Sequence, residues 1–213
     1  MSLLFESIRI ENGIIYHLEL HQKRIERSLI KLGSSNPIDL KQFTPTLDIP
    51  EKDIHKLRIS YDLMGIQEHQ IIPYILRTVK SVELMKCNEI VYDLKFEDRL
   101  LINQLTKSSK ADEIIIVKNG MITDASISNI LFSSNDQWFT PDTPLLEGTA
   151  RAHLIETGAI KSIPISLKDL KHFDSFCFVN ALNPFETTQK HPIELLLNNK
   201  KIILNSNDSL DLC

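Results

Sequence analysis

Long apolar runs are missing from this 213-residue sequence: no stretch approaches the roughly 20 residues that a membrane-spanning helix needs. Basic residues are not gathered into one region either. The 24 Lys and Arg are interspersed with 28 Asp and Glu, which gives a formal net charge of −4. A protein that follows a phosphate backbone needs a basic stripe. We therefore expect neither a membrane nor a nucleic acid as a partner.

Cysteine is also scarce. Cys87, Cys177 and Cys213 are widely spaced and odd in number, which fits a reducing cytoplasm better than a disulfide framework. The opening residues, MSLLFESIRI, lack the basic segment and apolar core of a secretory signal peptide, so we expect none. No metal site is expected. The sequence predicts a cytoplasmic protein.

The composition, 42% hydrophobic and 24% charged, is that of an ordinary soluble globular protein. A chain of this length can bury a substantial core, either as one large domain or as two small ones that share an interface. We place the joint near residues 80–88. This predicts a small N-terminal α+β domain over 1–84 and a C-terminal domain over 85–213.

The first half begins with a predicted hairpin, because Asn12-Gly13 separates two β-favouring runs. A helix is predicted next, because apolar residues recur at helical spacing: Leu20, Ile25, Leu29 and Leu32. Gly33 suits the C-terminal end of this helix. We expect a loop around 44–46 and strands over 55–62 and 70–80. Pro73 interrupts the second of these strands, which suits an edge position.

The second half repeats the strand-turn-strand pattern. We expect a helix through 98–109, a strand over 113–117, a turn at Asn119-Gly120 and a strand over 121–132. Further expected elements are a helix from Gly148 to about Gly158, a short helix capped by Ser166 and Asp169, a buried strand over 175–182, and a final hairpin around Asn198-Asn199.

Gly148-Thr149-Ala150-Arg151 is the most informative short motif. It opens a helix, where free N–H groups and the positive end of the helix dipole can bind phosphate. Glycine allows close approach of the backbone, and Thr149 adds a hydroxyl. Many helices begin in this way, so the motif alone is weak.

The order of several motifs is more specific. FESIR, LHQKRI, KLRISYD, a lysine, ADEIIIV-KNG-MITDASISNILF, LLEGTAR and FVNAL follow one another between Phe5 and Pro184. This series resembles the class IV enzymes that use pyridoxal 5'-phosphate (PLP), which include aminodeoxychorismate lyases and branched-chain and D-amino-acid aminotransferases. The resemblance implies a two-domain α+β and α/β fold like that of D-amino-acid aminotransferase, with the cofactor in the C-terminal domain, and a homodimer.

By the same resemblance, Lys95 is the lysine that binds the cofactor covalently and later moves protons. Asp124 stands where the family presents a carboxylate, usually Glu, to the pyridine nitrogen. Aspartate is one methylene shorter, so a backbone shift or a water would adjust the contact. Arg24 matches the arginine that binds the cofactor phosphate, and Thr149 and Ala150 supply the second phosphate contact.

Other residues have less defined roles. His21 could support Arg24 or be structural, and Asn129 is best interpreted as a supporting residue behind Asp124. Arg58 and Arg99 are candidates for a substrate carboxylate or the cofactor's 3'-oxygen, and equally for solvated salt bridges. Arg151 could brace the phosphate loop.

Two features favour the lyase branch. Asn180, with Ala181 and Leu182, resembles the Asn-Ala-Leu segment of those lyases, and we count it as a substrate-binding candidate. Ser7 falls where they have a threonine implicated in proton transfer. Glu6 instead resembles the branched-chain enzymes.

The favoured function is a 4-amino-4-deoxychorismate lyase that makes 4-aminobenzoate for folate synthesis. The alternatives are a class IV aminotransferase that acts on branched-chain or D-amino acids with a 2-oxo acid acceptor, and a PLP-binding or degenerate homologue without turnover. The last gains support from the absence of the strand and glycine-containing loop that precede FESIR in most relatives, and from the shortened stretch before Lys95.

Overall fold

The computed structural model describes residues 3–198, which form two compact units. Unit 1 holds the chain up to Leu76 together with Leu94–Asp98, and unit 2 holds Arg77–Asp93 and the residues from Arg99 onward. Lys95 thus lies in unit 1, whereas the sequence-based boundary assigns it to the C-terminal domain. Among the described helices, none has the length and apolar character needed to cross a membrane.

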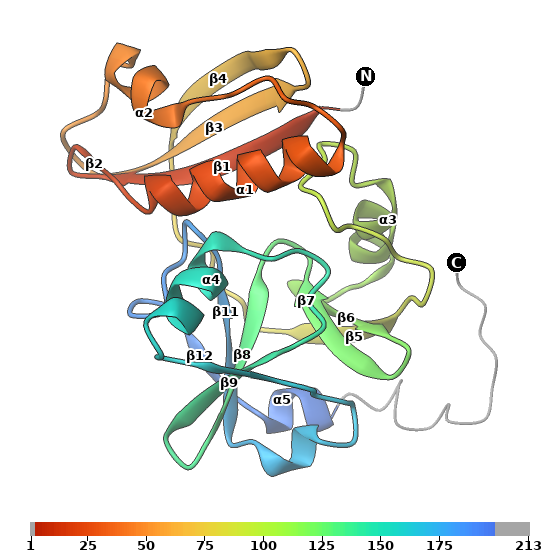
Figure 1. The fold of residues 1–213 in the computed structure, drawn as a ribbon. Coiled ribbons are helices and arrows are strands. Elements are labelled where there is room, and N and C mark those ends of the chain that lie inside the picture. The colour runs from red at the N-terminus through yellow and green to blue at the C-terminus, as the bar shows by residue number, and fades with distance from the viewer. Residues whose placement is uncertain (1–2, 199–213) are drawn as a thin grey trace. The chain divides into compact units, whose positions relative to one another are not determined.

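Unit 1 is built on a four-stranded antiparallel sheet in the order β2-β1-β3-β4 (Figure 1). Its strands are β1 (Leu4–Glu11), β2 (Ile14–Ile15), β3 (Ile54–Asp62) and β4 (Gly65–Pro73). Asn12 and Gly13 join β1 to β2 with φ values of 50° and 80°. Both angles are left-handed, as the tight hairpin turn predicted from Asn-Gly requires, so the opening hairpin is confirmed.

Helix α1 (Leu18–Lys31) packs on this sheet and is the helix predicted from the leucine and isoleucine spacing. Ile25 and Leu29 of α1 belong to the same buried cluster as Ile8 of β1 and Leu57 of β3. Gly33 follows the helix with φ 77°, as a C-terminal stop requires. Unit 1 is therefore a sheet with one face covered by α1.

Two expectations for unit 1 were wrong in detail. The residues 44–46 expected to be a loop form the 3₁₀ helix η1 (Thr44–Thr46), which directly follows a short helix, α2 (Leu40–Phe43). The strand expected over 70–80 stops at Pro73, and β4 instead extends back to Gly65. Because β4 pairs only with β3 in this sheet, it is an edge strand, and proline at its end removes no ladder hydrogen bond.

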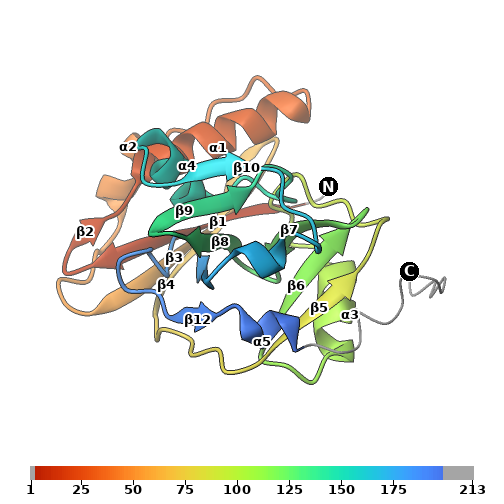
Figure 2. The same ribbon diagram turned by 90° about the horizontal axis from the view of Figure 1, so that it is seen from below.

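Unit 2 contains two sheets. One has five strands in the order β10-β9-β8-β11-β12, and the other has three in the order β5-β6-β7; Figure 2 shows β10 beside β9. The strands are β5 (Val82–Lys86), β6 (Glu113–Lys118), β7 (Met121–Ala125), β8 (Asn129–Ser134), β9 (Gln137–Pro141), β10 (Lys161–Ile163), β11 (Ser175–Val179) and β12 (Lys190–Pro192). Strand β5 is parallel to β6 and was not predicted, because residues 80–88 were expected to join the two domains. Helix α3 (Leu100–Ser108), which lies between β5 and β6 in the chain, is the predicted helix.

Helix α4 (Thr149–Glu156) begins after Gly148, as expected from the GTAR motif. Ser166 and Asp169 form the predicted cap, in which the Asp169 carboxylate accepts hydrogen bonds from the Ser166 N–H and hydroxyl ahead of the 3₁₀ helix η2 (Leu170–His172). The strand expected over 121–132 is in fact two strands, β7 and β8, separated by Ser126–Ser128. This turn separates Asp124 from Asn129.

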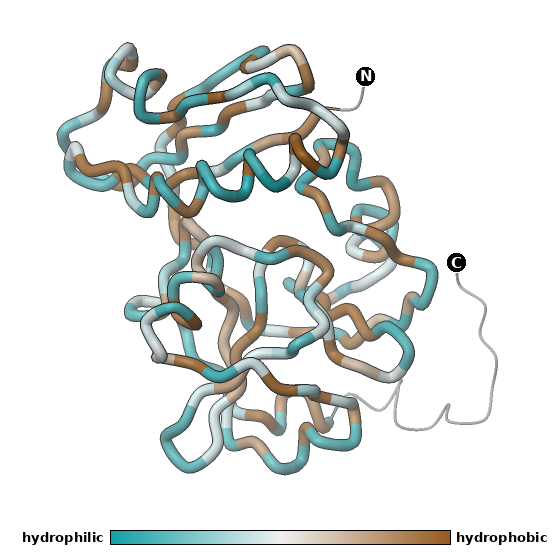
Figure 3. Tube along the Cα trace, viewed as in Figure 1, coloured by the Kyte–Doolittle hydropathy of each residue, from teal (hydrophilic) through white to brown (hydrophobic). Residues whose placement is uncertain are grey.

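At the end of the described chain, the expected hairpin was wrong for its first arm: residues 194–197 form helix α5 (Glu194–Leu197). The second arm lies outside the described residues. Helix α5 contributes Leu196 to the main apolar cluster of unit 2, which also contains Ile115, Phe132 and Phe176. In Figure 3 the β8–β9 hairpin tip is coloured as hydrophilic, which fits its sequence of Asn135 and Asp136.

Candidate functional site

Lys95 lies beside the ring of Phe5 in unit 1. Lys95 and Glu97 pair through their backbones with the start of β1: the Phe5 N–H donates to the Lys95 carbonyl at 3.0 Å, and the Glu97 N–H donates to the Leu3 carbonyl at 2.9 Å. The Lys95 Nζ is 4.4 Å from the Phe5 ring centroid, within the range of a cation–π contact. The lysine is therefore held by backbone pairing, with its amine against an aromatic face.

Arg58 and Glu97 share this region, which we call the lysine face. The Arg58 Cζ lies 4.2 Å from the centroid of the same Phe5 ring. Its Nη2 is 2.6 Å from the Glu97 carboxylate, and the Ser60 hydroxyl donates to the same carboxylate at 2.5 Å. Arg58 thus already has a carboxylate partner, and it would have to exchange or share that partner to bind a substrate carboxylate.

Ser7 belongs to the same face of the sheet. Side chains alternate along a strand, so Ser7 points to the side that Phe5 occupies, and its cross-strand neighbour is Arg58. Two residues of a strand span about 7 Å. The structure therefore brings together Lys95, Ser7 and Arg58, three of the residues predicted from the sequence.

Arg24 lies on the side of β1 that α1 covers. Its Nε donates to Glu6 Oε1 at 2.8 Å, and its Nη2 bonds Glu6 Oε2. The His21 Nδ1 is 2.5 Å from Glu6 Oε2. All three side chains are buried. The Glu6 carboxylate therefore fixes both polar residues of the LHQKRI motif.

The contacts among Glu6, His21 and Arg24 determine which of these side chains are charged. Burial would raise the pKa of Glu6, but the Arg24 charge and the His21 hydrogen bond outweigh it and bring the pKa to about 2. Burial lowers the pKa of His21, so the imidazole is neutral and donates a hydrogen bond to the carboxylate. Glu6 and Arg24 form a buried ion pair.

Asp124 is the centre of a second network, in unit 2. Its Oδ1 accepts from the Asn129 Nδ2 at 2.7 Å, and its Oδ2 accepts from the Leu146 N–H at 2.9 Å. Asn129 also donates to the Leu146 carbonyl at 2.9 Å. Asp124 and Asn129 together therefore hold the segment that leads into Gly148 and α4.

This carboxylate differs from Glu6 in its electrostatics. Burial raises the pKa of Asp124 to about 6, although the hydrogen bonds from Leu146 and Asn129 and the charge of Arg151 act in the opposite direction. The N–H groups that bind Asp124, from Leu145, Leu146 and Asn129, are neutral. A cationic partner would therefore favour the ionised form of Asp124.

Gly148 precedes α4 and lies against Asn129. A Cβ at this position would overlap the Asn129 Oδ1, so the close approach requires glycine. No side chain at the N-cap position caps α4, and Thr149 and Ala150 of its first turn are buried. The N–H groups of such a turn and the Thr149 hydroxyl have the chemistry to bind an anion.

Comparison with known proteins identifies the family. The model of the family "Amino-transferase class IV" matches residues 94–185. A Haemophilus influenzae protein of uncharacterized function is 37% identical over 184 residues, which cover 84% of this chain and 97% of that protein. The crystal structure of a Haemophilus somnus protein, provisionally named a 4-amino-4-deoxychorismate lyase, matches with a TM-score of 0.78 and 35% identity, covering 87% of this chain and 98% of that one. The chain belongs to the class IV aminotransferase family.

A third relative extends the comparison. A Schizosaccharomyces pombe protein, provisionally named an aminodeoxychorismate lyase, is 27% identical over 176 residues, or 75% of each chain. As a class IV protein, the chain is a PLP-dependent lyase or aminotransferase with the class IV fold. The sequence-based predictions of family, fold, cofactor and enzyme class are thus confirmed.

The residues of this class IV enzyme fit the cofactor. Asp124 is an acceptor-only group when ionised, and its environment favours ionisation once a cation is near, as a protonated pyridine nitrogen would be. The first turn of α4 suits a phosphate, and Lys95 offers an amine against an aromatic face. Lys95, Asp124, Arg24, Thr149 and Ala150 stay predicted cofactor residues by position.

Three predicted residues bind other parts of unit 2 instead of lying open for a ligand. Arg99 donates to the Ser126 carbonyl, and Asn180 donates to the Ser128 hydroxyl at 2.9 Å. Arg151 donates from Nη2 to the Pro141 carbonyl at 2.9 Å and to the Ser162 hydroxyl at 3.0 Å, so it ties α4 to β9 and β10. Arg151 therefore braces the first turn of α4, which is the role that the sequence suggested for it.

Sequence reasoning did not identify what Glu6, Glu97 and Glu113 do. Glu6 had a detectable signal: it occupies an inward position of a strand whose inward neighbours Leu4 and Ile8 are apolar. A carboxylate at such a position needs a buried partner. The side-chain partners of Glu97 and Glu113 are 36 or more positions away in the sequence, and the other partners of Glu113 are backbone N–H groups, so no local pattern identifies them.

Proposed function

We propose that this enzyme is a 4-amino-4-deoxychorismate lyase, which eliminates pyruvate and releases 4-aminobenzoate. The observation that carries the proposal is the placement of Ser7 with Lys95 on one face of the unit 1 sheet. A lyase needs two proton-transfer groups, one for the ring carbon and one for the leaving group. An amine and a hydroxyl supply both. The provisional names of the relatives from Haemophilus somnus and Schizosaccharomyces pombe support the same reaction.

The cofactor would be held covalently by Lys95, at its ring nitrogen by Asp124, and at its phosphate by Arg24 and the first turn of α4. When bound, PLP supplies an aldehyde that captures the substrate amine and a ring that withdraws electrons from the adjacent carbon. The Lys95 amine then removes the proton from the ring carbon that carries the nitrogen. The C–O bond to the enolpyruvyl group breaks as the ring becomes aromatic, and the Ser7 hydroxyl donates a proton to the departing pyruvate.

The alternative is a class IV aminotransferase that acts on branched-chain or D-amino acids with a 2-oxo acid acceptor. Arg58 favours it, because a guanidinium on the lysine face suits the carboxylate of an amino acid. Glu6 no longer supports this branch, since its role in binding Arg24 and His21 does not depend on the reaction. The two reactions share the capture of an amine and differ in whether pyruvate is released.

Two measurements test the proposal. The purified enzyme should show a visible band from the lysine-bound cofactor, which borohydride removes and Lys95→Ala lacks. Supplied with 4-amino-4-deoxychorismate, it should release 4-aminobenzoate and pyruvate in equal amounts, and Ser7→Ala should slow release without removing the band. Amino transfer to 2-oxoglutarate with no pyruvate would instead establish the aminotransferase. A band with no product from either substrate would contradict both.

Three further predictions belong with this function. If the product is 4-aminobenzoate, the enzyme supplies folate synthesis, and loss of the enzyme should be rescued by added 4-aminobenzoate. We also propose a homodimer, by analogy with the family, which sedimentation would test. A cytoplasmic location stays a prediction.

A further inference from the structure

The turn Ser126–Ser128 connects the strand that carries Asp124 to the strand that begins with Asn129. The turn is closed by a hydrogen bond from the Ala125 N–H to the Ser128 carbonyl at 2.8 Å. At its two ends, the side chains of Asp124 and Asn129 bond each other at 2.7 Å. The conformation of these three residues therefore sets the position of the carboxylate expected to hold the cofactor's ring nitrogen.

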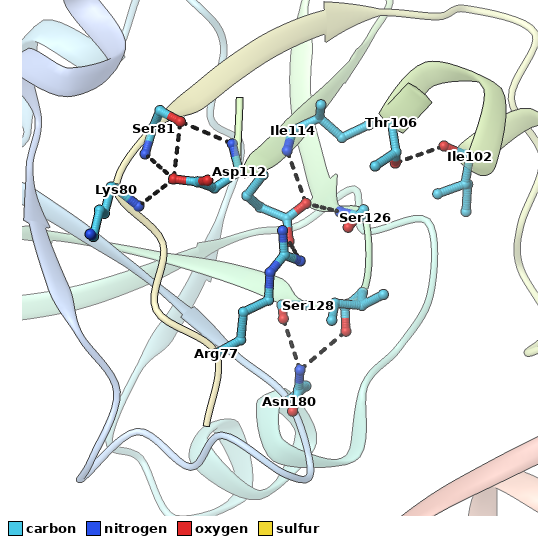
Figure 4. Close-up of polar contacts among 12 residues, drawn as sticks. Arg77, Lys80, Ser81, Ile102, Thr106, Asp112, Ile114, Ser126, Ser128 and Asn180 are labelled. Atoms are coloured by element: carbon cyan, nitrogen blue, oxygen red, sulfur yellow. Dashed lines mark hydrogen bonds and ion pairs between the residues drawn. The ribbon is translucent and has the colours of Figure 1, made fainter. Parts of the chain in front are cut away.

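Two side chains bind the first residue of the turn. The Glu113 Oε1 accepts from the Ser126 N–H at 3.1 Å and from the Ile114 N–H at 2.9 Å (Figure 4). Arg77 lies 3.2 Å from the other Glu113 oxygen. Arg99 donates to the Ser126 carbonyl. Both sides of this peptide segment are thus bound from other elements of unit 2.

Asn180 binds the remaining two residues of the turn. Its Nδ2 donates to the Ser128 hydroxyl at 2.9 Å and to the Ile127 carbonyl at 3.3 Å, as Figure 4 shows. Its Oδ1 accepts from the Leu182 and Asn183 N–H groups, each at 2.9 Å. The amide uses both donors on the turn and its oxygen at the end of β11. Aspartate could replace only the second function, because a carboxylate does not donate.

We propose that Asn180 is a positioning residue for the cofactor: it fixes the Ser126–Ser128 turn and, through the turn, the carboxylate of Asp124, and it does not bind the substrate. This replaces the substrate-binding role expected from the Asn-Ala-Leu segment. Arg99 and Glu113 act on the same turn from its other end. Asn180 and Arg99 carry N–H donors because they bind carbonyl groups of the turn. Glu113 carries an acceptor because it binds the Ser126 N–H.

Asn180→Asp is the sharpest test, because it keeps the acceptor for Leu182 and Asn183 and removes the donor to the turn. Asn103→Asp is the matched control: the same change on the exposed surface of α3. In cofactor-free protein, hydrogen exchange over residues 126–129 should increase in Asn180→Asp and not in Asn103→Asp. The dissociation constant for PLP, from titration of the visible band, should rise about tenfold, the factor that one hydrogen bond of about 1.4 kcal/mol gives.

Ser128→Ala provides a second variant should Asn180→Asp fold poorly. It removes one acceptor on the turn and leaves Asn180 intact, so PLP affinity should fall in the same direction by a smaller factor. The pH at which the bound cofactor changes colour should also shift in both variants, since Asp124 is displaced from the ring nitrogen. PLP affinity within twofold of the wild type in both variants would overturn the proposal. A raised KM for the amino substrate with unchanged PLP affinity would also overturn it and assign Asn180 to the substrate.

Discussion

Two buried carboxylates of this enzyme, Glu6 and Asp124, have opposite pKa shifts. Glu6 in unit 1 has a guanidinium and an imidazole against it, and its pKa falls to about 2. Asp124 in unit 2 is bound by neutral N–H donors, and its pKa rises to about 6 although the charge of Arg151 acts in the opposite direction. Burial disfavours the charge in both cases, and the strength of the interaction with a cation decides the outcome. At Glu6 the Arg24 charge and the His21 hydrogen bond outweigh burial, whereas at Asp124 burial dominates, so a pyridinium nitrogen would favour the ionised form of Asp124.

Removing the Glu6 charge should have the largest effect. Glu6→Gln leaves the buried Arg24 guanidinium without its carboxylate, and we expect a loss of about 3 to 5 kcal/mol in the free energy of unfolding. Urea denaturation would measure it. Glu11→Gln is the control, because Glu11 pairs with Arg9 at the partly exposed end of the same strand and its loss should stay near 1 kcal/mol or below.

A paired replacement separates stability from cofactor binding. Glu6→Leu with Arg24→Met should recover part of the lost stability, since an apolar pair can replace a buried ion pair, whereas the buried His21 N–H still loses its acceptor. It should not recover PLP affinity if Arg24 binds the cofactor phosphate. Full PLP affinity in this double variant would contradict the phosphate role predicted for Arg24.

The raised pKa of Asp124 should be detectable in the pH dependence of stability. In the cofactor-free enzyme the folded pKa of about 6 lies above the ordinary value of 3.8, so the folded state binds the proton more tightly. The free energy of unfolding should therefore fall by about 3 kcal/mol as the pH rises from about 4 to 6. Denaturation curves across this range should show that slope as the difference between wild type and Asp124→Asn.

Glu6 should make the free energy of unfolding depend on pH in the opposite direction, and at lower pH values. Its folded pKa of about 2 lies below the ordinary 4.5, so its stabilisation is present above pH 4.5 and is lost as the pH falls through 4.5 toward 2. Bound PLP should remove the Asp124 slope and leave the Glu6 slope unchanged. The same Asp124 slope with and without PLP would mean that Asp124 does not contact the cofactor.

Much of the fold was predictable because its signals are local. Asn12-Gly13 and Asn119-Gly120 each force left-handed turns, and the spacing along α1 identifies a buried face. The split at Ser126–Ser128 was not predictable, since no glycine or proline marks it and its geometry depends on side chains from other elements. Helix α5 was missed because a four-residue apolar run has no distinguishing period.

The sequence indicates candidate site residues by type and order, but it does not indicate their partners. The motifs around Lys95 make it the candidate lysine, while its pairing with β1 depends on the five residues Leu94–Asp98 that belong to unit 1. The contacts of Arg58 and Asn180 join positions 39 and 52 residues away. Such contacts depend on the tertiary fold, so the sequence left Arg58 open between a substrate carboxylate and a salt bridge, and it indicated only a substrate-binding role for Asn180.

Gly148→Ala should have an intermediate effect and tests the link between Asp124 and α4. The added Cβ overlaps the Asn129 Oδ1, so Asn129 must move and its hydrogen bond to Asp124 weakens. We expect about 1 to 3 kcal/mol of destabilisation, typical of overpacking, together with weaker PLP binding. Asn129→Ala alone and the double variant complete a cycle. Additive effects would show that Gly148 and Asn129 do not act on each other.

Glu97→Gln should have the smallest effect on stability and the most informative effect on the substrate. Glu97 and Arg58 are each 29% exposed, so losing this ion pair should cost less than about 1 kcal/mol. The amide oxygen can still accept from Ser60, but Arg58 loses its competing carboxylate. KM for a substrate that carries a carboxylate should then fall about threefold, the factor for about 0.6 kcal/mol. Glu68→Gln, opposite Ser60 on β4, is the matched control and should leave KM unchanged. If KM does not respond to Glu97→Gln either, Arg58 belongs to the protein's own packing, and the substrate carboxylate is bound elsewhere.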